Sequence, residues 1–349
     1  MKKSLLTILQ YFFFLGLGIL FVWLTVRDIT DEDWQHIKYS IKNARHWLVL
    51  PVLLLLLLSH YSRAKRWQLL MEPLGYQPSI FNTFAAVMIG YLVNAGVPRL
   101  GEVVKCTILA RYEKIRVDRL VGTIVVERAV DLVCLLVVLV AALITQGSVV
   151  GGFTLQLFGN MFSNAEGELS FTKLLWFLFF LTLFFAALYF ILKRFGHIDA
   201  IAKVKTFIRG IANGLASIRQ LQHKGWFLFH TVFIWFLYLF STTIGIYALR
   251  ETEHLGFGGG LTTLGIGSIG MILTPGGIGA YPLLVSELIG LYGLDEKTIG
   301  RALGWLLWSA QTLIIIIGGV IFFALLLYYN KRKNIENRKE HFEQDSIPD

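Results

Sequence analysis

The stretch Asn94-Ala-Gly-Val-Pro98-Arg99-Leu-Gly101-Glu102 decides the fold, because turn-forming and charged residues interrupt an apolar run here. A second break, Thr274-Pro275-Gly276-Gly277, interrupts another apolar run in the later half of the chain. Broken helices at corresponding places in two halves of a hydrophobic chain indicate a binding site near the bilayer midplane. This pattern favours a transporter over a simple membrane anchor.

The composition is that of a chain that lies mostly in lipid. Of its 349 residues, 55% are hydrophobic and 16% are charged, whereas soluble domains carry about 25% charged residues. The formal charge of +9 does not require a nucleic-acid partner, because basic residues also gather on the cytoplasmic side of membrane proteins. The two cysteines and the lack of zinc-protease, Walker or nucleophile-elbow motifs predict no disulfide framework, metal, cofactor or enzyme activity.

Uninterrupted apolar runs predict six full transmembrane helices, because each can cross a hydrocarbon core about 30 Å thick. They lie at Leu5–Val26, Trp47–Ser62, Leu120–Thr145, Leu174–Leu192, Trp226–Leu249 and Ala302–Tyr329. Two further apolar regions, Ile80–Tyr112 and Gly259–Tyr292, carry the breaks and are predicted to form re-entrant helical hairpins. The expected fold class is an all-α polytopic integral membrane protein.

Basic residues set the expected orientation. The segments on the side of the N-terminus hold 21 Lys and Arg residues, and those on the other side hold seven. The positive-inside rule therefore predicts that both termini are cytoplasmic, in what we expect to be the inner membrane of a bacterium. The hairpin near 80–112 then enters from the cytoplasm, and the hairpin near 259–292 enters from the outer side.

This order of elements makes the second half an inverted copy of the first. The predicted halves are 1–149 and 150–329, each with three spans and one hairpin. Residues 330–349 form a polar cytoplasmic tail that we expect to be disordered. Four residue pairs recur at a nearly constant offset between the halves: Trp47/Trp226, Gly90/Gly267, Pro98/Pro275 and Arg119/Arg301.

Two amphipathic segments are expected to lie on the membrane surface. The second runs from Ile201 to Ile218 and has basic residues available to anionic head groups. For the first, an ordinary connecting helix fits equally well. Its apolar residues at helical spacing are Trp34, Ile37, Ile41, Ala44 and Leu48.

Charged residues inside a predicted span are candidates for function, because charge is costly in lipid. The third span contains Glu127, Arg128 and Asp131, and Asp131 lies about 18 Å along the helix from Arg119. Helical spacing places Glu127 and Asp131 on one face and lets Arg128 reach Asp131. The alternative is a self-neutralised cluster that only locks helices together.

The first hairpin adds Arg99, Glu102 and Lys105 to these candidates. The six residues then carry three positive and three negative charges, and they could satisfy each other while the site is empty. A surface loop is the alternative for this stretch if the hairpin assignment is wrong.

The two tips are expected to contribute backbone groups to the same site. The helix that returns after each break begins near the bilayer centre, and its free N–H groups would favour an anion such as phosphate. Arg99 and Arg128 would add charge-assisted donors, while the carboxylates would be free to receive an amine or a proton. The tip residues are Asn94, Pro98, Gly101, Pro275, Gly276, Gly277 and Gly279.

Three segments together resemble the lysylphosphatidylglycerol synthase transmembrane region, the flippase-like membrane domain of the multiple peptide resistance factor family. The first is Arg66-Trp67 with Leu70 and Gly75. The second joins Asn94–Glu102 to Val126-Glu127-Arg128 and Asp131. The third is Pro275-Gly276-Gly277-Ile278-Gly279-Ala280. The likeness covers about residues 5–328 and implies the translocation of a lipid between leaflets.

Two positions depart from that family pattern. Lys105 stands where the family often has Arg. The family usually has an acidic residue soon after the Pro-Gly-Gly element, and this sequence has Tyr281-Pro282 in that region. The soluble aminoacyl-transferase domain is missing, so we expect that the chain does not make the lysyl-lipid itself.

The sequence thus favours a lipid flippase whose partners are membrane phospholipids or a lipid-linked substrate, with no nucleic acid. Three alternatives stay open. They are an ion-coupled carrier of a small anion, a membrane-embedded transferase acting on a lipid-linked substrate, and a non-catalytic assembly partner.

Overall fold

The computed structural model describes residues 16–97, 99–147, 149 and 221–345, together with scattered positions between 172 and 183. Within these residues every regular element is a helix, as the sequence predicts. Four of the described helices are long and apolar enough to cross a membrane: His46–Leu74, Lys224–Ile246, Arg250–Leu273 and Glu296–Arg332. The predicted fourth span, Leu174–Leu192, lies almost wholly outside the described residues.

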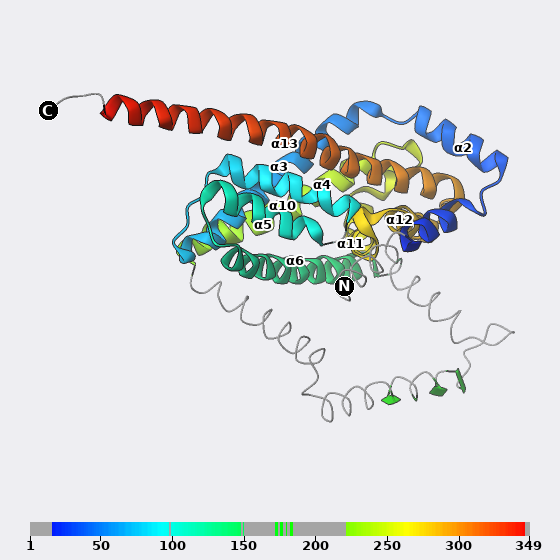
Figure 1. The fold of residues 1–349 in the computed structure, drawn as a ribbon. Coiled ribbons are helices and arrows are strands. Elements are labelled where there is room, and N and C mark those ends of the chain that lie inside the picture. Colours follow the sequence, from blue (N-terminus) through cyan, green and yellow to red (C-terminus); the bar gives the residue numbers. More distant parts are fainter. Residues whose placement is uncertain are drawn as a thin grey trace.

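The long helices α3 (Val49–Met71) and α10 (Lys224–Ile246) pack side by side (Figure 1). We predicted that the second span ends at Ser62, but α3 continues for more than two turns beyond it. The predicted span was too short because we ended it at the first charged residues. Buried partners allow these charged side chains to lie within the helix bundle, so the helix continues.

The first hairpin consists of α4 (Ile80–Gly96) and α5 (Leu100–Glu113). The two helices approach so closely at Gly90 and Gly101 that a Cβ atom on Gly101 would overlap the Gly90 carbonyl oxygen. Between them Arg99 adopts a left-handed conformation, with φ of 66°. Pro98 lies outside the described residues.

The second hairpin consists of α11 (Gly256–Leu273) and α12 (Ala280–Leu291), joined by a 3₁₀ turn at Pro275–Gly277. The φ angles of Gly276, Gly277 and Gly279 are 59°, 71° and 71°. Only glycine takes these left-handed values without strain, so the sequence can reverse here within a few residues. The tips of the two hairpins meet, because a Cβ atom on Gly276 would lie 3.4 Å from the Ala95 Cα atom.

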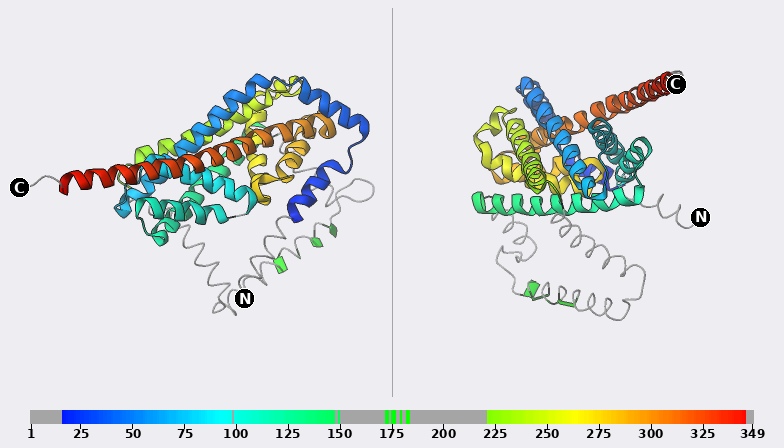
Figure 2. Two further views of the ribbon diagram at one scale, coloured as in Figure 1. Left: turned by 45° about the horizontal axis from the view of Figure 1, so that its top comes forward. Right: turned by 90° about the vertical axis from the view of Figure 1, so that its left-hand side faces the viewer.

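Two further long helices flank the hairpins. α6 (Val117–Thr145) runs along one edge of the bundle and packs against α5 and α11. α13 (Arg301–Asp345) crosses the opposite side and packs against α4 and α12 (Figure 2). We expected a disordered tail after residue 329, but α13 continues to Asp345. A helix that is already nucleated extends readily through the Lys, Glu and Arg residues of this tail.

The helix α2 (Asp31–Lys42) contains most of the first predicted amphipathic segment. Its buried residue Ile37 joins a cluster that includes Tyr281 and Leu303, so this face packs on protein rather than on a membrane surface. Trp34 and Ile41 remain exposed. Of the two interpretations, the connecting helix is the one that the packing favours. The second amphipathic segment, 201–218, lies outside the described residues.

Two of the apolar clusters each surround one hairpin. One cluster surrounds the first hairpin and includes Trp67, Met88 and Leu109. The other surrounds α12 and includes Tyr281 and Ile289. Each hairpin therefore has its own core, and the charged residues lie at the edge of the first one.

Candidate functional site

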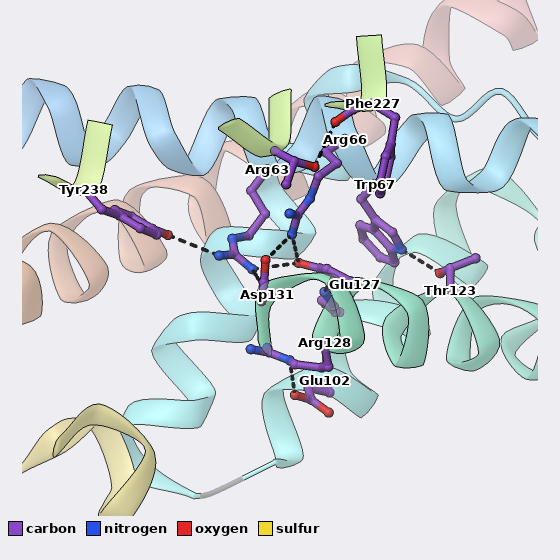
Figure 3. Close-up of polar contacts among 12 residues, drawn as sticks. Arg63, Arg66, Trp67, Glu102, Thr123, Glu127, Arg128, Asp131, Phe227 and Tyr238 are labelled. Carbon is purple, nitrogen blue, oxygen red and sulfur yellow. Dashed lines mark hydrogen bonds and ion pairs between the residues drawn. The ribbon is translucent and has the colours of Figure 1, made fainter. Parts of the chain in front are cut away.

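The candidate site forms where α3, α5 and α6 come together, and Glu127 is its centre (Figure 3). One carboxylate oxygen of Glu127 accepts a hydrogen bond from Arg63 Nη1 at 3.0 Å, and the other accepts one from Lys105 Nζ at 2.7 Å. The Glu127 side chain is only 1% exposed. A buried carboxylate is tolerated when both of its oxygens are paired, and this one is.

Asp131 lies one turn further along α6 and shares the Arg63 guanidinium. It accepts hydrogen bonds from Arg63 Nη1 at 2.5 Å and from Arg66 Nη2 at 2.7 Å. Asp131 is the central residue of α6, and its i,i+4 spacing from Glu127 places both carboxylates on one helix face. The structure turns this face toward Arg63 and Arg66 of α3. The guanidinium of Arg63 thus joins the two acids.

A second, more accessible ion pair lies beside this buried network. Arg128 Nε and Glu102 Oε1 are 2.9 Å apart, and the side chains are 44% and 28% exposed. The i,i+3 spacing would let Arg128 reach Asp131 within α6, but the structure pairs Arg128 with Glu102. Arg128 instead reaches across to α5, because Asp131 is already held by the two arginines of α3.

Two ion pairs cross the α5–α6 interface, and each helix supplies the acid of one pair and the base of the other. Glu102 of α5 binds Arg128 of α6, and Lys105 of α5 binds Glu127 of α6. Glu102 and Lys105 are three residues apart on α5, and they meet the neighbouring residues Arg128 and Glu127 of α6. Two ion pairs at different heights fix the rotation of α5 relative to α6. These ion pairs position the returning arm of the first hairpin.

Arg99 and Asn94 occupy the tip of the first hairpin and have different roles. Asn94 Oδ1 accepts a hydrogen bond of 2.8 Å from the Gly101 backbone N–H. Arg99 is exposed, and among the described residues we find no ion pair for it. The structure thus brings five of the six predicted charged residues together and leaves Arg99 outside their network.

We expected free N–H groups at the two tips, but several of them are already hydrogen-bonded. Asn94 already satisfies the Gly101 N–H, and the Ile278 carbonyl accepts the Ala280 N–H at 2.8 Å. Trp308 Nε1 further holds the second tip by donating to the Gly276 carbonyl at 2.8 Å. Side chains and turns saturate these backbone donors, so the guanidinium groups are the better candidates for binding an anion.

Arg63 and Arg66 are the site residues that sequence reasoning missed, because we counted them as cytoplasmic loop charges. Both are buried, at 6% and 0% exposure. Their i,i+3 spacing on a helix that continues past Ser62 was the available signal. Without these two residues the basic excess on the predicted cytoplasmic side becomes smaller but does not reverse.

Aromatic side chains enclose the network. Lys105 Nζ lies 4.6 Å from the centre of the Trp67 ring, and Trp67 Nε1 donates to Thr123 Oγ1 at 2.8 Å. Arg63 Nη2 also donates to the Tyr238 hydroxyl at 3.3 Å, which connects the network to α10. The face of the Trp67 ring attracts the Lys105 cation. In the described part of the chain, no cluster of three or more His, Cys, Asp and Glu residues could hold a metal.

The apolar helices, the broken hairpins and the enclosed ion pairs define a polytopic helical integral membrane protein. The chain belongs to the family described as the lysylphosphatidylglycerol synthase TM region, whose family model matches residues 8–319. The resemblance stated from the sequence is therefore confirmed. Neither a curated protein nor a solved structure matches the chain.

Proposed function

We propose that this protein is a lipid flippase that moves a phospholipid, or another lipid with an anionic head group, between the leaflets of a bacterial inner membrane. The observation that carries the proposal is the buried network of Arg63, Lys105, Glu127 and neighbouring charges beside a broken hairpin. Charged groups inside a membrane bundle mark substrate pathways by default. Membership of a lipid-related membrane family supports the same function.

The proposed architecture is an inverted repeat of residues 1–149 and 150–329, with both termini in the cytoplasm. The helix contacts support it. If α3, α4, α5 and α6 correspond to α10, α11, α12 and α13, then the packing of α4 on α13 matches that of α11 on α6. In the same way the packing of α5 on α6 matches that of α12 on α13. In such a repeat the two halves rock around a site at their boundary.

The Arg128–Glu102 pair is the proposed contact point for the head group. Both side chains are partly exposed, whereas the pairs around Glu127 are enclosed. A phosphate that approaches Arg128 can replace the Glu102 carboxylate with an equivalent charge-assisted hydrogen bond. The acyl chains would stay in lipid while the head group crosses.

The test is leaflet exchange in liposomes that contain the purified protein. Phosphatidylglycerol with a fluorophore on one acyl chain is followed for the wild type, for Arg128→Ala and for the control Arg116→Ala. Arg116 is a suitable control because its side chain is 69% exposed and it pairs only with the nearby Asp118 among the described residues. We expect exchange with the wild type and Arg116→Ala, and its loss with Arg128→Ala. Exchange that is unaffected by Arg128→Ala would contradict the proposed site, and no exchange by any folded variant would contradict the function.

A further inference from the structure

The ion-pair network described above does not balance, and its imbalance is positive. Each of the three carboxylates has at least one cationic partner within hydrogen-bond distance. One positive charge therefore remains after every carboxylate is counted. The members are the cations Arg63, Arg66, Lys105 and Arg128 and the anions Glu102, Glu127 and Asp131.

The excess charge lies in the enclosed part of the network. Arg63, Arg66 and Lys105 are all at least nine-tenths buried and share only two carboxylates, those of Glu127 and Asp131. An uncompensated charge away from water is unfavourable, because the protein interior solvates it poorly. An anion that joins the network would remove this penalty, whereas a cation would increase it.

Unused hydrogen-bond donors in the same place indicate what kind of anion fits. Arg66 Nε and Nη1 and Arg63 Nε are buried and have no hydrogen-bond partner. Each of these N–H groups can donate to a phosphate oxygen, and guanidinium–phosphate hydrogen bonds are charge-assisted. Three such donors on adjacent turns of α3 are suited to an oxyanion with several acceptor oxygens.

The carboxylates that would bind an amine of the substrate are already paired with cations of the protein. The Lys105 ammonium group binds one oxygen of Glu127 and lies against the Trp67 ring. The sequence left the carboxylates free to receive an amine, but all three are engaged by the protein's own cations. An aminoacylated head group would have to displace one of them.

We infer that the network selects a lipid whose head group carries phosphate without a compensating amine, and that Arg66 determines this specificity. The inference rests on the proposed flippase function and narrows its substrate class. It separates this chain from the aminoacylated lipid that the family resemblance implies. A free phosphate ion shares the chemistry of such a head group, so the test includes both.

The first experiment uses the wild-type protein alone. Liposomes carry acyl-labelled phosphatidylglycerol, phosphatidylethanolamine or lysyl-phosphatidylglycerol, which have one negative charge, no net charge and one positive charge. We expect phosphatidylglycerol to exchange at least about tenfold faster than the other two, a factor that corresponds to about 1.4 kcal/mol. Equal exchange of all three would overturn the inference and leave the flippase function standing.

A second arm measures the uptake of labelled inorganic phosphate into the same liposomes. If no lipid exchanges but phosphate enters, and Arg66→Lys reduces that entry, the lipid function is overturned and oxyanion selection is kept. If neither lipid nor phosphate moves, both proposals are overturned. Arg66→Lys is informative because it keeps the charge and removes the fork of donors.

Two charge variants test the imbalance itself. Lys105→Gln makes the network neutral, and Glu102→Gln raises its excess to two positive charges. We expect the preference for phosphatidylglycerol over phosphatidylethanolamine to fall several-fold in Lys105→Gln and to rise in Glu102→Gln. Elution as a single folded species in detergent is checked for both. An unchanged preference in folded variants would show that the excess charge does not select the head group.

Discussion

The two hairpins have similar backbones but different chemistry. Each consists of two helices that cross closely at glycine and are joined by a break in the left-handed region. The first, between residues 80 and 113, contains five charged residues, whereas the second, between 256 and 291, contains Glu287 alone. Similar geometry thus occurs with and without charge, which teaches that close packing makes the break and that the ion pairs serve another purpose.

Replacing the central acid of the first hairpin region should have the largest effect. Glu127→Gln removes the carboxylate that binds Lys105 and leaves Arg63 with Asp131 alone, and breaking a buried ion pair costs about 3–5 kcal/mol. Glu287→Gln in the second hairpin should cost less than about 1 kcal/mol, because Glu287 is exposed and forms no ion pair with the described residues. Thermal unfolding in detergent measures both. Equal destabilisation would mean that the hairpins do not differ in this way.

The glycine crossings should be the next most sensitive positions, and in both hairpins. Gly101→Ala and Gly270→Ala each force a Cβ atom against backbone, and we expect costs of about 1–3 kcal/mol. The larger cost is expected for Gly101, where the Cβ atom would overlap a carbonyl oxygen. Gly96→Ala is the control, because nothing lies within 4 Å of its Cβ position. The same unfolding assay applies, and a neutral result at both crossings would contradict the packing argument.

Removing the hydrogen bond that holds each tip should have a smaller effect. Asn94→Ala frees the Gly101 N–H, and Trp308→Phe frees the Gly276 carbonyl. A single hydrogen bond of this kind contributes about 1 kcal/mol. Amide hydrogen exchange of each tip measures the local opening. If the Asn94→Ala tip exchanges no faster than the wild type, Asn94 does not hold the break.

The smallest effect is expected from a charge that is near the first hairpin but exposed. Hydrogen bonds from Arg116 lower the pKa of the Asp118 carboxyl below its usual value. Because the pKa is lower in the folded state, the pair stabilises the fold above the unfolded pKa and loses this contribution as the pH falls through the folded pKa. Asp118→Asn should therefore unfold slightly earlier than the wild type at neutral pH, and the difference should vanish in acid. A large difference at neutral pH would show that exposed charge also matters here.

Local signals explain which parts of the site were predictable. Turn residues marked both breaks and charges marked the first, and the i,i+4 spacing of Glu127 and Asp131 placed them on one face. The partners were not predictable in the same way. Arg128 could bind Asp131 within α6 or Glu102 on α5. It binds Glu102 because two arginines of α3 already bind Asp131.

The helical class, the membrane location, the two broken apolar runs and the family could all be inferred from the amino-acid sequence, because they depend on local composition and spacing. The three-dimensional packing of the helices was needed to place Arg63 and Arg66 in the site, to show that Asn94 occupies the Gly101 N–H and to reveal the excess positive charge of the network. The physical reason is that a charge can stay inside a hydrophobic bundle only beside partners from other helices. No local pattern states which helices those are.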